Sequence, residues 1–223
     1  MPIDALTHTT PAMAGVSPTT TPCEAEQAVV LSNVSWRIYL ELRDSPCNRG
    51  LRMTYADGEL EIMTLSGFHE LISHIIDHFI IEWCIAKNIP IRPGGSMTLR
   101  REPLERGLEG DQCYFVQSES QVRGLELLVS EKTPLPDLVV EVVHKSAVVG
   151  KLPIYSRLGV PEIWHWRSEA LTVFQWAEGQ YIERTDSLAL PRFPFDQLQL
   201  ALSRRTQRDL TALLSEFRQW LAK

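Results

Sequence analysis

The sequence lacks three features that would define its class at once: paired cysteines, a long hydrophobic run and an excess of positive charge. No two of its cysteines form a Cys-x-x-Cys pair, so it predicts neither a disulfide framework nor a thiolate zinc site. The cysteines are Cys23, Cys47, Cys84 and Cys113. No run approaches the ~18 apolar residues that a membrane-spanning helix requires. These absences favour the reducing cytoplasm and no membrane partner.

The net charge limits which classes of binding partner the protein can have. The formal net charge is -6. This sign disfavours broad, non-specific adhesion to nucleic acid or anionic membranes, because the summed field of the protein repels phosphates at long range. A local basic patch for such a partner remains compatible with this balance.

The length and composition predict one globular domain preceded by a tail. The chain has 223 residues, of which 44% are hydrophobic and 22% are charged, as is usual for globular proteins. Residues 1–26 are dominated by Thr, Pro, Ser and Ala, with too little apolar surface to offset the entropy of ordering. They also lack the basic start and apolar core of a secretory signal. We therefore expect a disordered tail over 1–26 and a single domain over 27–223.

Hydrophobic spacing predicts an α/β (α+β) fold with a mixed β-sheet flanked by helices. An N-terminal helix is expected at 32–42, followed by a β-hairpin that turns at Asp57-Gly58. Further elements are a long helix ending at Asn88, strands within 89–99, 112–116 and 135–143, a helix over 151–159, a hairpin turning at Glu178-Gly179, and an amphipathic C-terminal helix from about 204 to 221.

The stretch PDLVVEVV places two carboxylates in an apolar strand. Its residues are apolar on both faces apart from Asp137 and Glu141, which indicates a central strand covered on both sides. Four residues of strand span roughly 13 Å, so these two acids cannot bind one cation together. A carboxylate at Glu141 is costly to bury without a partner, and the best candidate on a neighbouring strand is Asp111.

Asp111 and Glu141 together satisfy the needs of a hard cation. Mg²⁺ binds through about two carboxylates, with water and substrate phosphate in its remaining positions. Such a cation orients a nucleophilic water and stabilises charge on a scissile phosphate. Lys151, ten residues beyond Glu141, is the nearest candidate for a supporting positive charge.

The ordered motifs DGELEIM, FHELI, PDLVVEV and KLPIYSRLGVPEIW resemble the Uma-two family of candidate endonucleases. That family belongs to the PD-(D/E)xK, restriction-endonuclease-like superfamily, and the resemblance covers about residues 30–190. It implies a restriction-endonuclease-like core with an N-terminal helix and β-hairpin, Mg²⁺ or Mn²⁺ as the cofactor, and DNA as the substrate.

The resemblance also implies roles for particular residues. Asp111 and Glu141 match the metal-binding acids, and Glu70 matches an acid on the first helix that assists the metal or water. Val143 stands where many members of the superfamily have lysine, and Lys151 matches a lysine displaced to the following helix. Gly110 stands where the family usually has proline.

Other readings of the same residues stay open. Glu141 and Lys151 are also compatible with a purely structural ion pair, in which case the protein would be an inactive nuclease-fold scaffold that binds a protein or nucleic acid. His74 and His78, four residues apart on a helix, suggest a zinc hydrolase less strongly. The C-terminal amphipathic helix covers either its own sheet or a second subunit, so a homodimer is possible.

Overall fold

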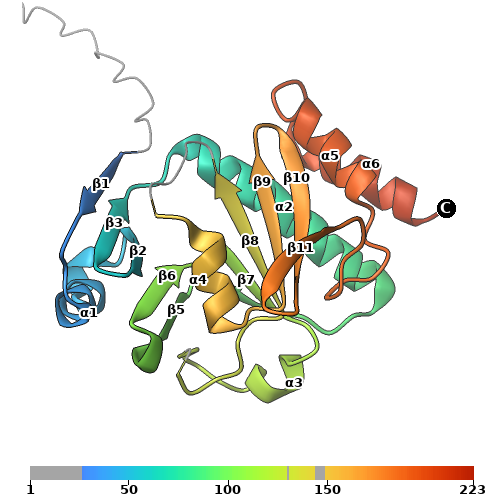
Figure 1. Cartoon of the computed structure of the whole chain (residues 1–223). Coiled ribbons are helices and arrows are strands. Elements are labelled where there is room, and N and C mark those ends of the chain that lie inside the picture. The colour runs from blue at the N-terminus through green and yellow to red at the C-terminus, as the bar shows by residue number, and fades with distance from the viewer. Residues whose placement is uncertain (1–26, 130, 144–148) are drawn as a thin grey trace, which may run out of the picture.

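Two β-sheets lie side by side in the computed structural model, with helices packed around them (Figure 1). The structure describes residues 27–129, 131–143 and 149–223. The tail expected over 1–26 lies outside these residues. Within the described part of the chain, no helix is both long and apolar enough to cross a membrane.

The first sheet is antiparallel, and a short helix covers part of it. Its strand order is β1 (Ala28–Leu31), β3 (Glu59–Met63), β2 (Arg52–Ala56), β6 (Arg106–Glu109) and β5 (Thr98–Arg101). The N-terminal helix predicted at 32–42 is α1 (Trp36–Asp44). Trp36 and Tyr39 of α1 form an apolar cluster with the buried residues Tyr55 and Leu60. Short 3-10 helices span Pro46–Asn48 and Glu102–Leu104.

The predicted hairpin at Asp57-Gly58 is confirmed as the turn between β2 and β3. Both turn residues have positive φ angles, 53° for Asp57 and 86° for Gly58. That conformation matches the twist of the flanking strands and is adopted readily by Asp-Gly. Arg106 of β6 donates two hydrogen bonds, of 2.8 and 2.7 Å, to the Asp57 carboxylate, which ties the turn to the same sheet.

The second sheet is mixed, as the sequence predicts. Its order is β11 (Gln180–Arg184), β10 (Ala170–Ala177), β9 (Glu162–Arg167), β8 (Leu138–Val143), β7 (Gln112–Phe115) and β4 (Arg92–Gly95). β8 and β9 are parallel and the other neighbours are antiparallel. β8, which contains the PDLVVEVV carboxylate Glu141, is an interior strand of this sheet.

Helices cover both faces of the mixed sheet (Figure 1). The side chains of Leu138, Val140 and Val142 face α2 (Gly67–Lys87), α5 (Phe195–Arg204) and α6 (Leu210–Leu221) in one core cluster. Val139 faces α4 (Lys151–Leu158) in the other, which also includes residues of the first sheet. The alternation along β8 is therefore the one expected for a strand buried on both sides. One further short helix, α3, spans Glu119–Val122.

The long helix α2 begins and ends at residues suited to capping. The Ser66 side chain accepts a hydrogen bond of 3.2 Å from the His69 backbone N–H, as N-cap serines do. Asn88 ends the helix with a positive φ of 52°, a conformation common at helix C-termini. The N-terminal cap fixes the first turn of α2, where His69 and Glu70 lie.

The C-terminal helix predicted from about 204 is α6, and an additional helix, α5, precedes it. α5 ends at Arg204, and α6 begins after Asp209, whose side chain accepts a 2.9 Å hydrogen bond from Ala212 N–H. Phe217 of α6 stacks on Phe79 of α2, with ring centroids 4.4 Å apart. The apolar face of α6 therefore covers a helix of its own chain.

Phe217→Ala tests this packing. We expect it to lower the free energy of unfolding by about 3–5 kcal/mol, because it opens a cavity against Phe79. The loss, measured by urea denaturation, should not depend on protein concentration, since the contact lies within one chain. Ile85→Ala, on the exposed side of α2, should change it by only about 0.5 kcal/mol. A loss that varies with concentration would instead place α6 between subunits.

Candidate active site

The two acids selected from the sequence lie side by side where the two sheets meet. Asp111 stands between β6 of the first sheet and β7 of the second. β7 pairs with β8 so that Gln112 is opposite Val140, and continuing this register places Asp111 opposite Glu141. The Val142 backbone N–H donates a 2.8 Å hydrogen bond to Asp111 Oδ2, which holds the carboxylate against β8.

Lys151 reaches the same place from the first residue of α4. Its Nζ lies 2.7 Å from Glu141 Oε2 and 3.4 Å from the backbone oxygen of Glu109. The start of α4 is tied to the first sheet, because Val149 N–H donates a 3.0 Å hydrogen bond to Glu61 Oε2 on β3. Strand and helix together therefore bring the lysine and the acid into contact across ten residues of sequence.

Tyr155, one helical turn beyond Lys151, forms a hydrogen bond with the second carboxylate oxygen of Glu141. Its hydroxyl donates a hydrogen bond to Glu141 Oε1, and its side chain is fully buried. Gly110 makes room for this arrangement, since a Cβ there would lie 3.2 Å from the Tyr155 hydroxyl and 2.9 Å from Cys113 Sγ. The glycine before Asp111 is thus required by packing.

Asp111 is held by a histidine from α2. His69 Nε2 lies 2.9 Å from Asp111 Oδ2, and both side chains are buried. Asp111 Oδ1 is buried as well and has no hydrogen-bond partner in the described chain. One oxygen of this carboxylate is therefore fixed, while the other is buried without a hydrogen-bond partner among the described residues.

Glu70 does not join this cluster. Its side chain is 48% exposed, and its carboxylate lies 3.9 Å from His74 Nε2 on the next turn of α2. No contact in the described residues links it to Asp111 or Lys151. The first turn of α2 does reach the site, but through His69.

The environment separates the proton affinities of the two acids. Burial, and then the negative charge of Asp111, raise the pKa of Glu141 to about 7, although Lys151 and Tyr155 act in the opposite direction. Burial also acts to raise the pKa of Asp111, but Lys151 and His69 outweigh it and hold that pKa at about 2. Near neutral pH, Asp111 is ionised and Glu141 is poised between its two states.

His165 is a further titratable neighbour. It stands opposite Glu141 in the parallel pairing of β8 with β9, so its side chain is directed to the same face of the sheet. Partial burial, followed by the charges of Arg167 and Lys151, lowers its pKa. His165 is therefore mainly neutral at pH 7.

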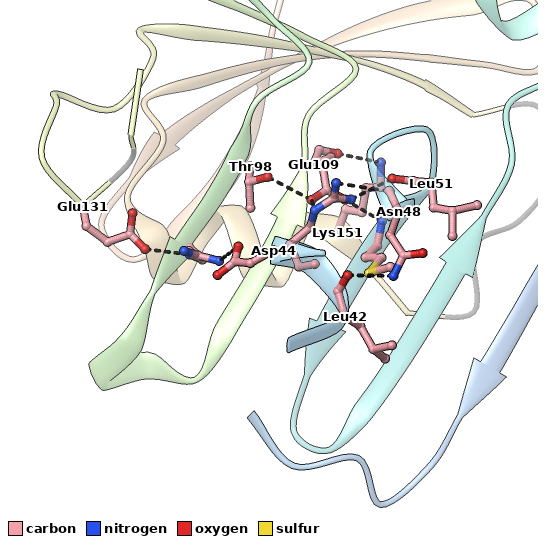
Figure 2. Close-up of polar contacts among 11 residues, drawn as sticks. Leu42, Asp44, Asn48, Leu51, Thr98, Glu109, Glu131 and Lys151 are labelled. Atoms are coloured by element: carbon pink, nitrogen blue, oxygen red, sulfur yellow. Dashed lines mark hydrogen bonds and ion pairs between the residues drawn. The ribbon is translucent and has the colours of Figure 1, made fainter. Parts of the chain in front are cut away.

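Glu109 joins the site to a second polar network (Figure 2). Its backbone oxygen accepts from Lys151, while its carboxylate accepts from Thr98 Oγ1 at 3.1 Å and from the Met53 backbone N–H. Arg43 Nε lies 3.3 Å from the same carboxylate. Burial raises the pKa of Glu109, opposed by its hydrogen bond from Met53 and by Arg43.

A groove of about 590 Å³ begins beyond this network. Arg43 and Thr98 line it, together with Arg100, which donates 2.7 Å hydrogen bonds to Asp44 and Glu131. Figure 2 shows these two acids on either side of one side chain. Four arginines and three acids of the described chain line the groove, so its charge is mixed.

Two other polar features of the sequence have structural positions. Asp137, at the entrance of β8, accepts hydrogen bonds from the backbone N–H groups of Val116 and Ser118, so it shapes a turn far from Lys151. His74 and His78 lie on the exposed side of α2 with ring centroids 6.5 Å apart. In the described residues, no group of three or more His, Cys, Asp or Glu side chains is arranged to hold a metal.

The acids at the sheet junction nevertheless suit one kind of cation. Mg²⁺ commonly uses only one or two protein carboxylates and completes its shell with water and phosphate. Asp111 offers the unpartnered Oδ1, and Glu141 lies opposite it on β8. These oxygen ligands match Mg²⁺ or Mn²⁺ better than zinc, which prefers His and Cys ligands, but Lys151 and Tyr155 already bond to the two oxygens of Glu141.

Neither His69 nor Tyr155 was predicted from the sequence as a site residue. His69 is one residue from Glu70, and only the rotation of α2 decides which of the two faces Asp111. Tyr155 is four residues from Lys151 on α4, a spacing that places both on one helix face. The spacing was therefore a usable signal for Tyr155, whereas no local signal distinguishes His69.

Two acids and a lysine at the centre of a mixed sheet flanked by helices define the class of restriction-endonuclease-like folds. The family model Uma2, described as "Putative restriction endonuclease", matches residues 36–222. The chain therefore belongs to the Uma2 family. A comparison with curated proteins gave no match.

The difference between the pKa values of Glu141 and Asp111 predicts that the two carboxyl groups titrate in different pH ranges. By carboxyl-carbon NMR, Glu141 should titrate near pH 7, and Lys151→Met should move its midpoint upward by removing a charge that favours the ionised form. Lys87→Met, on the surface of α2, should leave the midpoint in place. A Glu141 midpoint near its ordinary value of 4.5 would contradict this description of the site.

The raised pKa of Glu141 also determines how the free energy of unfolding should change with pH. Because the folded-state pKa of Glu141 lies above its ordinary value, this group contributes stability that is fully present below about pH 4.5. That contribution is lost as the pH rises through about 7. Compared with Glu141→Gln, the wild-type protein should therefore lose free energy of unfolding between about pH 5 and 8.

Proposed function

We propose that this protein is a Mg²⁺- or Mn²⁺-dependent endonuclease that hydrolyses phosphodiester bonds in DNA. The observation that carries the proposal is the convergence of Asp111, Glu141 and Lys151 from three separate elements at one buried point. Family membership supports nuclease chemistry. The free cysteines Cys47, Cys84 and Cys113 are compatible with action in the cytoplasm.

The proposed cation site consists of Asp111 and Glu141. A cation bound there would supply orientation of the attacking water and neutralisation of charge on the scissile phosphate. His69 and the Val142 N–H fix Asp111 Oδ2, and Oδ1, which has no partner among the described residues, would bind the cation. The low pKa of Asp111, about 2, keeps this carboxylate ionised at every pH at which the enzyme would work.

Lys151 supplies the positive charge in this proposal. The carboxylates of Glu141 and Asp111 raise its pKa, although burial acts to lower it, so the ammonium group stays protonated at neutral pH. It therefore donates hydrogen bonds and does not accept a proton from water. We assign it to positioning the attacking water or to stabilising negative charge on the phosphate.

The second candidate function is an inactive scaffold of the same fold. The observation that favours it is the full engagement of Glu141, whose two oxygens are occupied by Lys151 and Tyr155. A buried ion pair closed in this way can serve structure alone. Such a protein would bind a protein or nucleic-acid partner without cleaving it.

A cleavage assay separates the two functions. We expect the wild type to cut plasmid or single-stranded DNA with Mg²⁺ or Mn²⁺ and to stop when a chelator is added. Asp111→Asn, Glu141→Gln and Lys151→Met should each lower the rate at least about 100-fold, because the first two remove ligands of the proposed cation and the third removes a positive charge beside the reacting phosphate.

Matched surface variants control for this assay. Glu183→Gln and Lys87→Met make the same chemical changes at exposed positions, and both should keep the wild-type rate. Each site variant must remain folded by circular dichroism. Cleavage that survives Glu141→Gln would overturn the site, and no cleavage of any DNA with either metal would favour the scaffold.

The contribution of α2 to the candidate active site can be tested separately. His69→Ala should reduce cleavage more than Glu70→Gln does, because His69 contacts Asp111 while Glu70 is directed to His74. Binding of Mn²⁺, followed by calorimetry, should weaken about 10-fold or more in His69→Ala. A larger loss of cleavage in Glu70→Gln would restore the role that the family resemblance implies for that acid.

A further inference from the structure

The strand β1 is a sheet edge without the usual protection. Edge strands commonly carry charged residues, proline or a bulge, which prevent another strand from pairing with them. In the described sheets, β4 has Pro93 and a register shift, β5 has Arg100 and Arg101, and β11 has Glu183 and Arg184. β1 is Ala-Val-Val-Leu, with neither charge nor proline.

The backbone of β1 presents hydrogen-bonding groups at this edge. Thr64 N–H donates a 3.0 Å hydrogen bond to the Gln27 oxygen, so the pair formed by Gln27 and Thr64 is a hydrogen-bonded one. Such pairs alternate along an antiparallel ladder, and Val29 and Leu31 therefore bond to β3. The N–H and C=O groups of Ala28 and Val30 are directed away from β3, toward the open edge.

The apolar face of the sheet also continues to this edge. Val29 and Leu31 stand opposite Ile62 and Leu60, and directly opposed residues share one face of a sheet. Leu60 is completely buried, whereas Val29 is 59% exposed and Leu31 is 42% exposed. The face that α1 covers at Leu60 is left open at β1.

We propose that β1 pairs with β1 of a second copy of this chain, joining the two five-stranded sheets across a two-fold axis. Antiparallel pairing of Ala28 in one copy with Val30 in the other satisfies the outward groups of both residues. This register places the two Val29 side chains against each other on the axis. Dimerisation through β1 does not require that the protein cleaves DNA.

A second copy is the occupant that this edge suits best. A two-fold interface requires a self-complementary surface, and the uncharged sequence Ala-Val-Val-Leu places no like charges opposite each other. The strand has four residues, so the area buried is below that of a standard stable interface. The dimer is therefore of moderate affinity, with a dissociation constant in roughly the micromolar range.

The same edge is connected to the candidate active site. Val30 stands opposite Glu61 on β3, and the Glu61 carboxylate accepts the hydrogen bond from Val149 N–H at the start of α4. Lys151 follows two residues later. Pairing at β1 would thus brace the strand that positions this helix.

The full-length wild type, studied by sedimentation velocity over about 1–200 µM, should shift from monomer to dimer. Val29→Lys should raise the dissociation constant at least about 10-fold, because it places two ammonium groups together on the axis. Val30→Pro should do the same, since it removes an outward N–H without breaking a bond to β3.

The control is Leu188→Lys, which makes a similar exchange of an exposed apolar residue outside β1, at a side chain that is 57% exposed. It should dimerise as the wild type does. Circular dichroism verifies the fold of each variant, and Val29→Lys alone decides the outcome if Val30→Pro does not fold.

Three results would overturn the proposal. The first is a wild type that stays monomeric across the concentration range. The second is a dimer that neither β1 variant weakens, which would place the interface elsewhere. The third is a monomer whose Val30 amide is nevertheless protected from hydrogen exchange, which would assign the edge to residues 1–26 of the same chain.

Discussion

The buried ion pair between Lys151 and Glu141 is the interaction on which the organisation of the site depends. Its two side chains are almost completely removed from solvent, and the ammonium and carboxylate groups are 2.7 Å apart. Separating such a pair leaves a buried charge uncompensated, at a cost of several kcal/mol. The elements that carry the two residues, α4 and β8, are therefore held in one relative position.

Several features of the surrounding structure accommodate this pair. Tyr155 satisfies the remaining oxygen of Glu141, and Gly110 leaves the space that the Tyr155 hydroxyl requires. The opposing acid, Asp111, lies where the chain passes from one sheet to the other. Its charge is balanced by Lys151 and His69, so one lysine serves both carboxylates. A buried cluster of two acids and one lysine with this charge balance can serve catalysis or can serve structure alone. Whether the protein cleaves DNA distinguishes these two roles.

Much of the secondary structure could be predicted because its signals are local. The Asp-Gly hairpin, the capped helix α2 and the doubly buried strand β8 follow from turn chemistry, capping and alternation over a few residues. The pairing of Asp111 with Glu141 also followed, since strand geometry excluded Asp137 as the partner. The helix predicted from about 204 is confirmed as α6, but it begins only after the Asp209 cap, and α5 was not predicted.

The sequence by itself determined the main element types, the central strand and the acids and lysine of the candidate site. Only the tertiary structure decided that the strands divide into two sheets, that His69 and not Glu70 faces Asp111, and that β1 is an edge strand of its sheet among the described residues. The physical reason is the separation along the chain over which each kind of interaction acts. Propensity, capping and alternation act over one or two turns, whereas helix rotation, sheet division and ion pairing across elements depend on contacts between residues far apart in the chain.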